Sequence, residues 1–135
     1  MNYFEFAKRS YEMLEAYFVI GEKYEWYNEF SVLCQQVVER FMKAIIKSFN
    51  DPNIDERIYN SHHLVQMAEI INTHLADLID VKTAAWIEDF YFDAGYPIAD
   101  FVVVHRDTAL KLGEATTQLC ETLIEAYNKF TTIQD

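Results

Sequence analysis

The sequence has little of the material that tight turns and flexible loops require. Its 135 residues include 3 glycines and 2 prolines, too few for glycine-rich phosphate-binding loops or for the many turns of a β-sandwich. Apolar residues make up 51% of the chain and aromatic residues 16%, which excludes a disordered or collagen-like protein. The composition therefore predicts a single domain, residues 1–135, built from long helices.

Cysteine and metal-binding patterns are equally scarce. Cys34 and Cys120 are the two cysteines, and neither lies in a CxxC or Cys–His spacing. Both fall on the apolar face of an expected helix, which predicts buried thiols without a redox role. The sequence contains no ExxH, HxxxH or HExxH spacing, so no metal site is expected.

Positive charge is in short supply. The chain has 11 Lys and Arg against 22 Asp and Glu, a formal net charge of −11, which argues against DNA binding or non-specific coating of RNA. The longest apolar runs, such as residues 101–104, are far too short to cross a membrane, and the first ten residues do not resemble a secretory signal. We expect a cytoplasmic protein without a membrane partner.

Apolar residues recur at steps of three and four along most of the chain. This spacing predicts helices over residues 4–21, 30–49 and 64–78, a shorter one over 82–94 and a long one over 107–130. Residues 102–104 are β-like but isolated, and we interpret them as a buried loop. The expected stops and N-caps are residues 50–53, Asn60 or Ser61, Asp80, residues 95–97 and Asp107. The predicted fold is all-α, an antiparallel up-and-down four-helix bundle with an additional short helix.

Two adjacent histidines precede the third helix. At a helix N-terminus the backbone dipole opposes protonation, so His62 or His63 could act as a neutral proton acceptor. The alternative is that one histidine caps the helix or lies in an interface while the other is solvated.

The second helix carries polar residues that allow two interpretations. Arg40, Lys43 and Lys47 are spaced by three and four, so they could hold phosphate oxygens, or they could form a solvated face paired with Glu39. Gln35 and Gln36 could read a base edge or form a hydrogen bond between helices.

The sequence has more aromatic residues than one small core can bury. An exposed aromatic surface is typical of a homodimer interface. The residues concerned are Tyr3, Phe6, Tyr24, Trp26 and Tyr27.

Three short motifs together resemble the HEPN family of helical domains. Residues 34–44 are similar to its QQxxEKxxKA motif, and Ser61-His62-His63-Leu64 begins a match to SHDLxxL. Tyr91 followed by Gly95-Tyr96-Pro97 resembles YxxxRYP, and Ala109 lies where the last helix of the family opens. The resemblance spans nearly the whole chain, with order and spacing both matching.

The resemblance implies a dimeric helical bundle that handles a nucleotide or RNA near the motif surface. Members are often partnered with a minimal nucleotidyltransferase, and some branches are metal-independent ribonucleases of toxin–antitoxin pairs. Gly95 stands where the family commonly has arginine, and His63 where it has aspartate. The missing arginine weakens any phosphate contact at that corner.

We therefore expect a non-catalytic HEPN-type dimer that needs no cofactor and binds a nucleotide such as ATP or GTP, or RNA, or a minimal nucleotidyltransferase partner. Its expected binding residues are Gln36, Arg40, Lys43, His62 and Tyr96.

Two alternatives remain open. In a ribonuclease, the RxxxxH spacing from Arg57 to His62 would supply a phosphate-stabilising cation and a base for the 2′-hydroxyl, although it lies in a loop and not in the last helix. In a purely structural interaction module, Gln35, Gln36 and His62 would be buried and hydrogen-bonded to backbone.

Overall fold

The chain forms a bundle of helices, and the prediction of an all-α fold is confirmed. The computed structural model describes residues 2–93 and 102–134, and within these residues there is no strand. The helices are α1 Tyr3–Glu22, α2 Tyr27–Ser48, α3 Leu64–Leu75, α4 Val81–Asp93 and α5 Arg106–Gln134, with a short 3₁₀ helix, η1, at Glu56–Asn60. None of the helices in the described residues is long and apolar enough to span a lipid bilayer.

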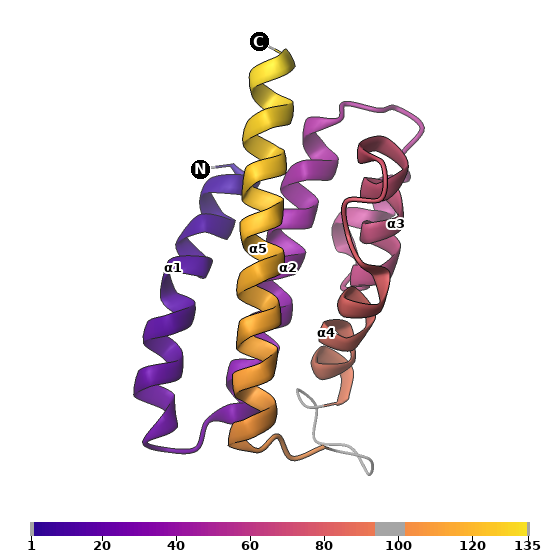
Figure 1. The fold of residues 1–135 in the computed structure, drawn as a ribbon. Coiled ribbons are helices and arrows are strands. Elements are labelled where there is room, and N and C mark those ends of the chain that lie inside the picture. The colour runs from indigo at the N-terminus through magenta and orange to yellow at the C-terminus, as the bar shows by residue number, and fades with distance from the viewer. Residues whose placement is uncertain (1, 94–101, 135) are drawn as a thin grey trace.

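Helix α2 is the centre of the bundle. It contacts α1, α3, α4 and α5, with α1 and α5 on one side and the α3–α4 pair on the other (Figure 1). Its buried side chains include Val37, Phe41 and Ile45, and burial extends around most of its circumference. A helix enclosed in this way must satisfy its polar side chains within the protein. Three of them, Gln35, Glu39 and Lys43, are buried at four-residue steps along one face.

Most helix ends follow the local signals in the sequence. Asn2 and Glu5 form a reciprocal capping box at the start of α1. Glu25, with φ of 57°, turns the chain between α1 and α2. Asp80 caps α4 as predicted, because its carboxylate accepts the Lys82 N–H at 3.0 Å.

Three expected boundaries were wrong. Helix α3 ends at Leu75 and not near residue 78, because Ala76 and Asp77 adopt left-handed backbone with φ of 47° and 55°. The N-cap of α3 is His63, and its N–H donates to the Ser61 hydroxyl, so neither Asn60 nor Ser61 is the cap. Asp107 lies inside the first turn of α5, where its negative charge interacts favourably with the positive end of the helix dipole.

The segment before α5 is a loop, but only partly a buried one. Val104 is buried, whereas Val102 and Val103 are exposed. The Asn28 side chain fixes this loop, since its amide nitrogen donates to the Val102 carbonyl at 2.6 Å and its oxygen accepts the Val104 N–H at 2.7 Å. The prediction that residues 95–97 end α4 lies outside the described residues.

Both cysteines are buried, as predicted. Burial raises the pKa of the Cys34 thiol to about 12, and burial raises the pKa of Cys120 as well. At neutral pH both are protonated thiols inside the core, which is the form least suited to redox chemistry.

Candidate functional site

Glu39 is a buried carboxylate at the centre of a polar cluster. The residue is 8% exposed, and its two oxygens share three donors. Oε2 accepts from Lys43 Nζ at 2.9 Å, while Oε1 accepts from Gln35 Nε2 at 3.1 Å and lies 2.8 Å from His62 Nδ1. The cluster therefore joins α2 to the residue pair that precedes α3.

Charge pairing keeps this carboxylate ionised despite its burial. Burial alone would raise the pKa of Glu39, but its hydrogen bonds to Lys43, His62 and Gln35 outweigh that effect and lower the pKa below its ordinary value. A carboxylate can only accept hydrogen bonds, so the facing Nδ1 of His62 carries a proton and Nε2 points away from Glu39.

His62 is held in place but remains accessible. Its side chain is 47% exposed, and its ring stacks on Tyr91 of α4 with 4.7 Å between ring centroids. Gln35 also donates to the His62 backbone carbonyl at 2.9 Å. The buried carboxylate thus fixes one edge of the imidazole, the Tyr91 ring stacks on its face, and the buried amide holds the His62 backbone. The side chain remains partly open to solvent.

His63 repeats this arrangement with different partners. Its Nδ1 lies 3.7 Å from Oε1 of Glu88, and its ring stacks on Phe92 at 5.1 Å. The same Glu88 oxygen accepts the Val65 N–H at 3.2 Å. Glu88 therefore accepts a hydrogen bond from the first turn of α3, and its distance to His63 is too long for a hydrogen bond. Of the two histidines, His62 is the one oriented by a buried group.

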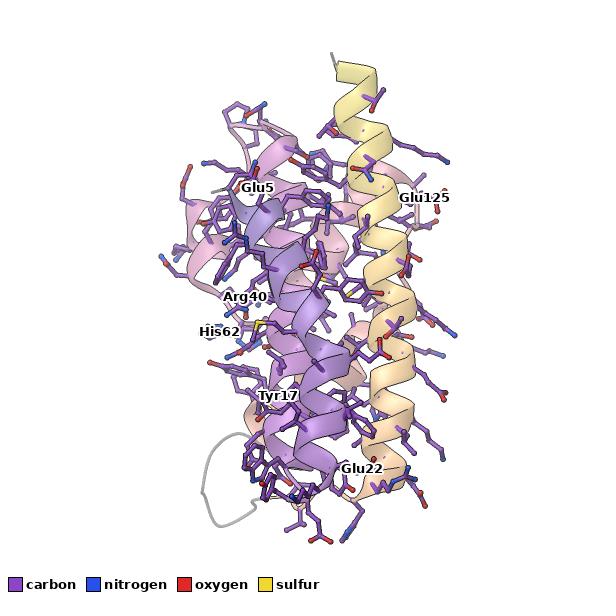
Figure 2. The ribbon with its side chains drawn as sticks, turned by 90° about the vertical axis from the view of Figure 1, so that its left-hand side faces the viewer. Glu5, Tyr17, Glu22, Arg40, His62 and Glu125 are labelled. Atoms are coloured by element: carbon purple, nitrogen blue, oxygen red, sulfur yellow. The ribbon has the colours of Figure 1, made fainter. Side chains whose placement is uncertain are left out.

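Arg40 extends the site toward α1. Its guanidinium donates to the Ser10 hydroxyl at 2.6 Å and lies over the Phe6 ring at 4.4 Å. Figure 2 shows Arg40 and His62 on the same flank of the molecule, in agreement with the bond between His62 and the residue next to Arg40 in α2.

A second cation–ring contact lies farther along α2. Lys47 is 5.2 Å from the centroid of the Tyr59 ring, which stacks on Tyr3 of α1 at 6.0 Å. We define the His62 face as His62, Arg40, Phe6, Lys47 and Tyr59. It places two cations over aromatic rings in a chain whose net charge is −11.

The predicted binding residues are divided between surface and interior. Arg40 is half-buried and His62 exposed, and Gln36 is half-buried on α2. Lys43 is buried and bonded to Glu39, so residues 40, 43 and 47 do not form one exposed row of cations. The expected pairing with Glu39 occurs for Lys43, but inside the protein and not on a solvated face. Tyr96 lies outside the described residues.

Arg57 and His62 have separate partners. The Arg57 side chain is 90% exposed and donates to Asp55 at 2.7 Å, within the local turn that caps η1. The His62 side chain instead bonds to Glu39 and stacks on Tyr91. A purely structural interaction module would require Gln35, Gln36 and His62 to be buried and hydrogen-bonded to backbone. Of these three residues, only Gln35 meets both conditions.

Sequence reasoning missed the residue that organises the site. Glu39 was considered only as a partner for surface cations, although it stands four residues from both Gln35 and Lys43. That spacing was the available signal, because it puts three polar residues on one face of the helix. Ser10 gave no comparable signal, since its role depends on a contact distant in sequence. Tyr91 belongs to the motif that resembles YxxxRYP, but its stacking on His62 could not be predicted from that motif.

The described residues contain no group of three or more His, Cys, Asp or Glu side chains suited to holding a metal ion. What the arrangement offers is an oriented imidazole beside cations and rings. No protein-family model, curated protein or solved structure matches this chain.

Proposed function

We propose that the chain is a HEPN-type domain that binds a nucleotide, ATP or GTP, or the end of an RNA strand, on the His62 face, without catalysing a reaction by itself. One observation carries the proposal: the buried Glu39 orients His62, whose side chain is partly exposed on the same flank of the molecule as Arg40 (Figure 2). Arginine and lysine side chains can bind phosphate oxygens. The exposed Nε2 of His62 can donate to a phosphate oxygen when the ring is protonated, and it can accept from a hydroxyl or a base N–H when the ring is neutral. Exposed rings can stack on a base.

The site chemistry also assigns different roles to the residues of α2. Arg40 and Lys47 contact aromatic rings at the surface, so either could turn toward a phosphate with small rearrangement. Lys43 is bonded to Glu39 in the interior. We infer that Lys43 positions Glu39 and that a ligand does not touch it.

Calorimetric titration with ATP, GTP and a short RNA tests this proposal. We expect saturable binding that His62→Ala and Arg40→Gln each weaken about tenfold, equivalent to about 1.4 kcal/mol. His74→Ala is a matched control, because His74 also pairs with a carboxylate and stacks on a ring, at the other end of α3. Arg106→Gln, which removes an arginine bonded to Glu22, controls for the loss of a cation.

Absence of binding to the wild-type protein would overturn the proposal, as would an equal loss in His74→Ala. Circular dichroism on every variant distinguishes a lost ligand contact from a lost fold.

A second candidate function is metal-independent RNA cleavage. The bond of His62 to an ionised, buried carboxylate favours it, because the carboxylate fixes the orientation of the imidazole for proton transfer. Loss of cleavage in both His62→Ala and Arg57→Ala would support the RxxxxH interpretation. Loss in His62→Ala and Arg40→Gln, with Arg57→Ala active, would assign the phosphate-stabilising role to Arg40.

The proposal includes a homodimer and a nucleotidyltransferase partner. Support for the dimer comes from α1, where Phe6, Met13 and Ile20 are exposed at seven-residue steps on one face, followed by exposed Tyr24 and Trp26. The nucleotidyltransferase rests on the resemblance of the motifs alone. Sedimentation should give a dimer that the pair Met13→Glu and Ile20→Glu dissociates, while Val103→Glu, at another exposed apolar residue, leaves it intact.

A further inference from the structure

A groove separates the middle of α1 from the first half of α5. Its volume is about 570 Å³. The floor includes Leu14 of α1, Phe30 of α2 and Ala109 of α5, all buried, and the half-buried Phe18 and Leu110 line it as well. At Gly113, which also lines the groove, a Cβ atom would lie 3.2 Å from Cζ of Phe30. Its lack of a side chain therefore lets α5 approach the floor without filling the groove.

The two banks of the groove carry the same charge. Glu12 and Glu15 lie along the α1 side and Glu114 on the α5 side, and all three are exposed. Among the described residues, the lining includes no lysine or arginine. The basic residues nearest in sequence along these helices, Arg9 and Lys111, are outside the lining.

Contacts between α1 and α5 close the groove at both ends. The Phe4 and Tyr127 rings stack at 3.9 Å near the start of α1, and Arg106 pairs with Glu22 near its end. The open part runs over residues 11–18 of α1 and 109–118 of α5, which is about 10 to 14 Å of helix. In Figure 1, α1 and α5 run in opposite directions along this region.

We propose that this groove binds a helical segment of a partner protein with an apolar face flanked by lysine or arginine. Its length accommodates about two turns of helix, which place apolar side chains at i, i+3 or i+4, and i+7 in the groove. The carboxylates on both banks then face the flanking cations, and their like charge disfavours an acidic segment. The groove shares no residue with the His62 face, so the interaction is independent of nucleotide binding.

Binding of designed peptides to the full chain tests the proposal. The probe is a helical peptide of about 18 residues with leucine on one face and lysine on the flanks, labelled for fluorescence anisotropy. We expect it to bind at about 0.15 M salt, and the same peptide with glutamate in place of lysine to fail to bind. The triple variant Glu12→Gln, Glu15→Gln, Glu114→Gln should bind the lysine peptide at least tenfold more weakly than the wild type does.

Two matched controls separate the groove from the general acidity of the chain. The variant Glu25→Gln, Glu56→Gln, Glu69→Gln removes the same charge from exposed residues outside the groove and should bind the peptide as the wild type does. Gln118→Trp places a large side chain at an exposed residue of the lining and should block binding, whereas Asn128→Trp, elsewhere on α5, should not.

Several results would overturn the proposal: no binding of the lysine peptide, equal binding of both peptides, or equal losses in the two triple variants. A change in the oligomeric state of the groove variants, with peptide binding unaffected, would assign the groove to a second copy of this chain and would likewise overturn it.

Discussion

The two ends of α3 carry the same pair of groups in different surroundings. At the N-terminal end, His62 bonds to Glu39 and stacks on Tyr91. At the C-terminal end, His74 lies 3.0 Å from Asp51 and stacks on Phe49 at 4.2 Å. Glu39 is buried among Lys43 and Gln35, whereas Asp51 lies in a turn and also accepts the Asn53 N–H at 2.9 Å.

The difference lies in what fixes the carboxylate. Asp51 is held by its own turn, so His74 closes a local contact between the α2–η1 loop and α3. Glu39 is held by the core of the bundle, and its position changes only if α2 rearranges. A histidine oriented by the core is suited to binding or proton transfer, because its geometry is fixed before a ligand arrives.

The largest expected effect that distinguishes the two ends is on stability. Glu39→Ala leaves the Lys43 ammonium buried without its partner, so we expect it to lower the free energy of unfolding by about 3–5 kcal/mol. Asp51→Ala should cost far less, because solvent replaces the lost contacts. Urea denaturation at pH 7 measures both.

A rescue experiment checks the cause of that loss. Adding Lys43→Met to Glu39→Gln removes both charges and should recover part of the stability lost in Glu39→Gln alone. Similar small losses in Glu39→Ala and Asp51→Ala would mean that the buried pair does not organise this end of the molecule.

A smaller effect follows from replacing each histidine by phenylalanine, which keeps a ring for stacking and removes the nitrogens. His62→Phe takes one donor from a buried carboxylate and should cost about 1–3 kcal/mol. His74→Phe should change stability by less than about 0.5 kcal/mol. Thermal and urea unfolding of the two variants give the comparison, and equal losses would contradict the role assigned to the burial of Glu39.

The sequence was sufficient for the helices and insufficient for the site. Periodic apolar residues define α1, α2 and α5 because each helix packs apolar side chains against its neighbours. Asp80 marks the start of α4 because it bonds to a backbone N–H only two residues away. The end of α3 was misplaced because Leu78 continues the apolar pattern while Ala76 and Asp77 leave helical geometry. No local rule predicts left-handed backbone at an alanine.

The same limit applies to the polar cluster. Glu39, Gln35 and Lys43 can be placed on one face of α2 from their spacing, but their burial depends on α3 and α4 covering that face. The bond from Glu39 to His62 joins residues 23 positions apart, and the Ser10 contact of Arg40 joins residues 30 apart. Spacing within one helix contains no information on either contact.

The smallest expected difference between the two ends is in their dependence on pH and salt. The pKa of Glu39 is lowered in the folded protein because its hydrogen bonds outweigh burial. The unfolded chain therefore takes up the proton first. The stabilisation by this ionised group is complete above the ordinary glutamate value of about 4.3, and it is lost as the pH falls through the lower pKa of the folded state.

The pKa of Asp51 is lowered too, by its bonds to the Asn53 backbone and to His74, so both groups destabilise the protein in acid with the same sign. Salt separates them, because about 1 M NaCl screens an exposed pair strongly and a buried one weakly. Unfolding of wild type, Glu39→Gln and Asp51→Asn between pH 7 and pH 3, at low and high salt, measures each contribution. High salt should reduce the contribution of Asp51 to the free energy of unfolding and leave the contribution of Glu39 unchanged. If salt reduced both equally, Glu39 would be as accessible to solvent as Asp51, and the orientation of His62 could not be attributed to the core of the bundle.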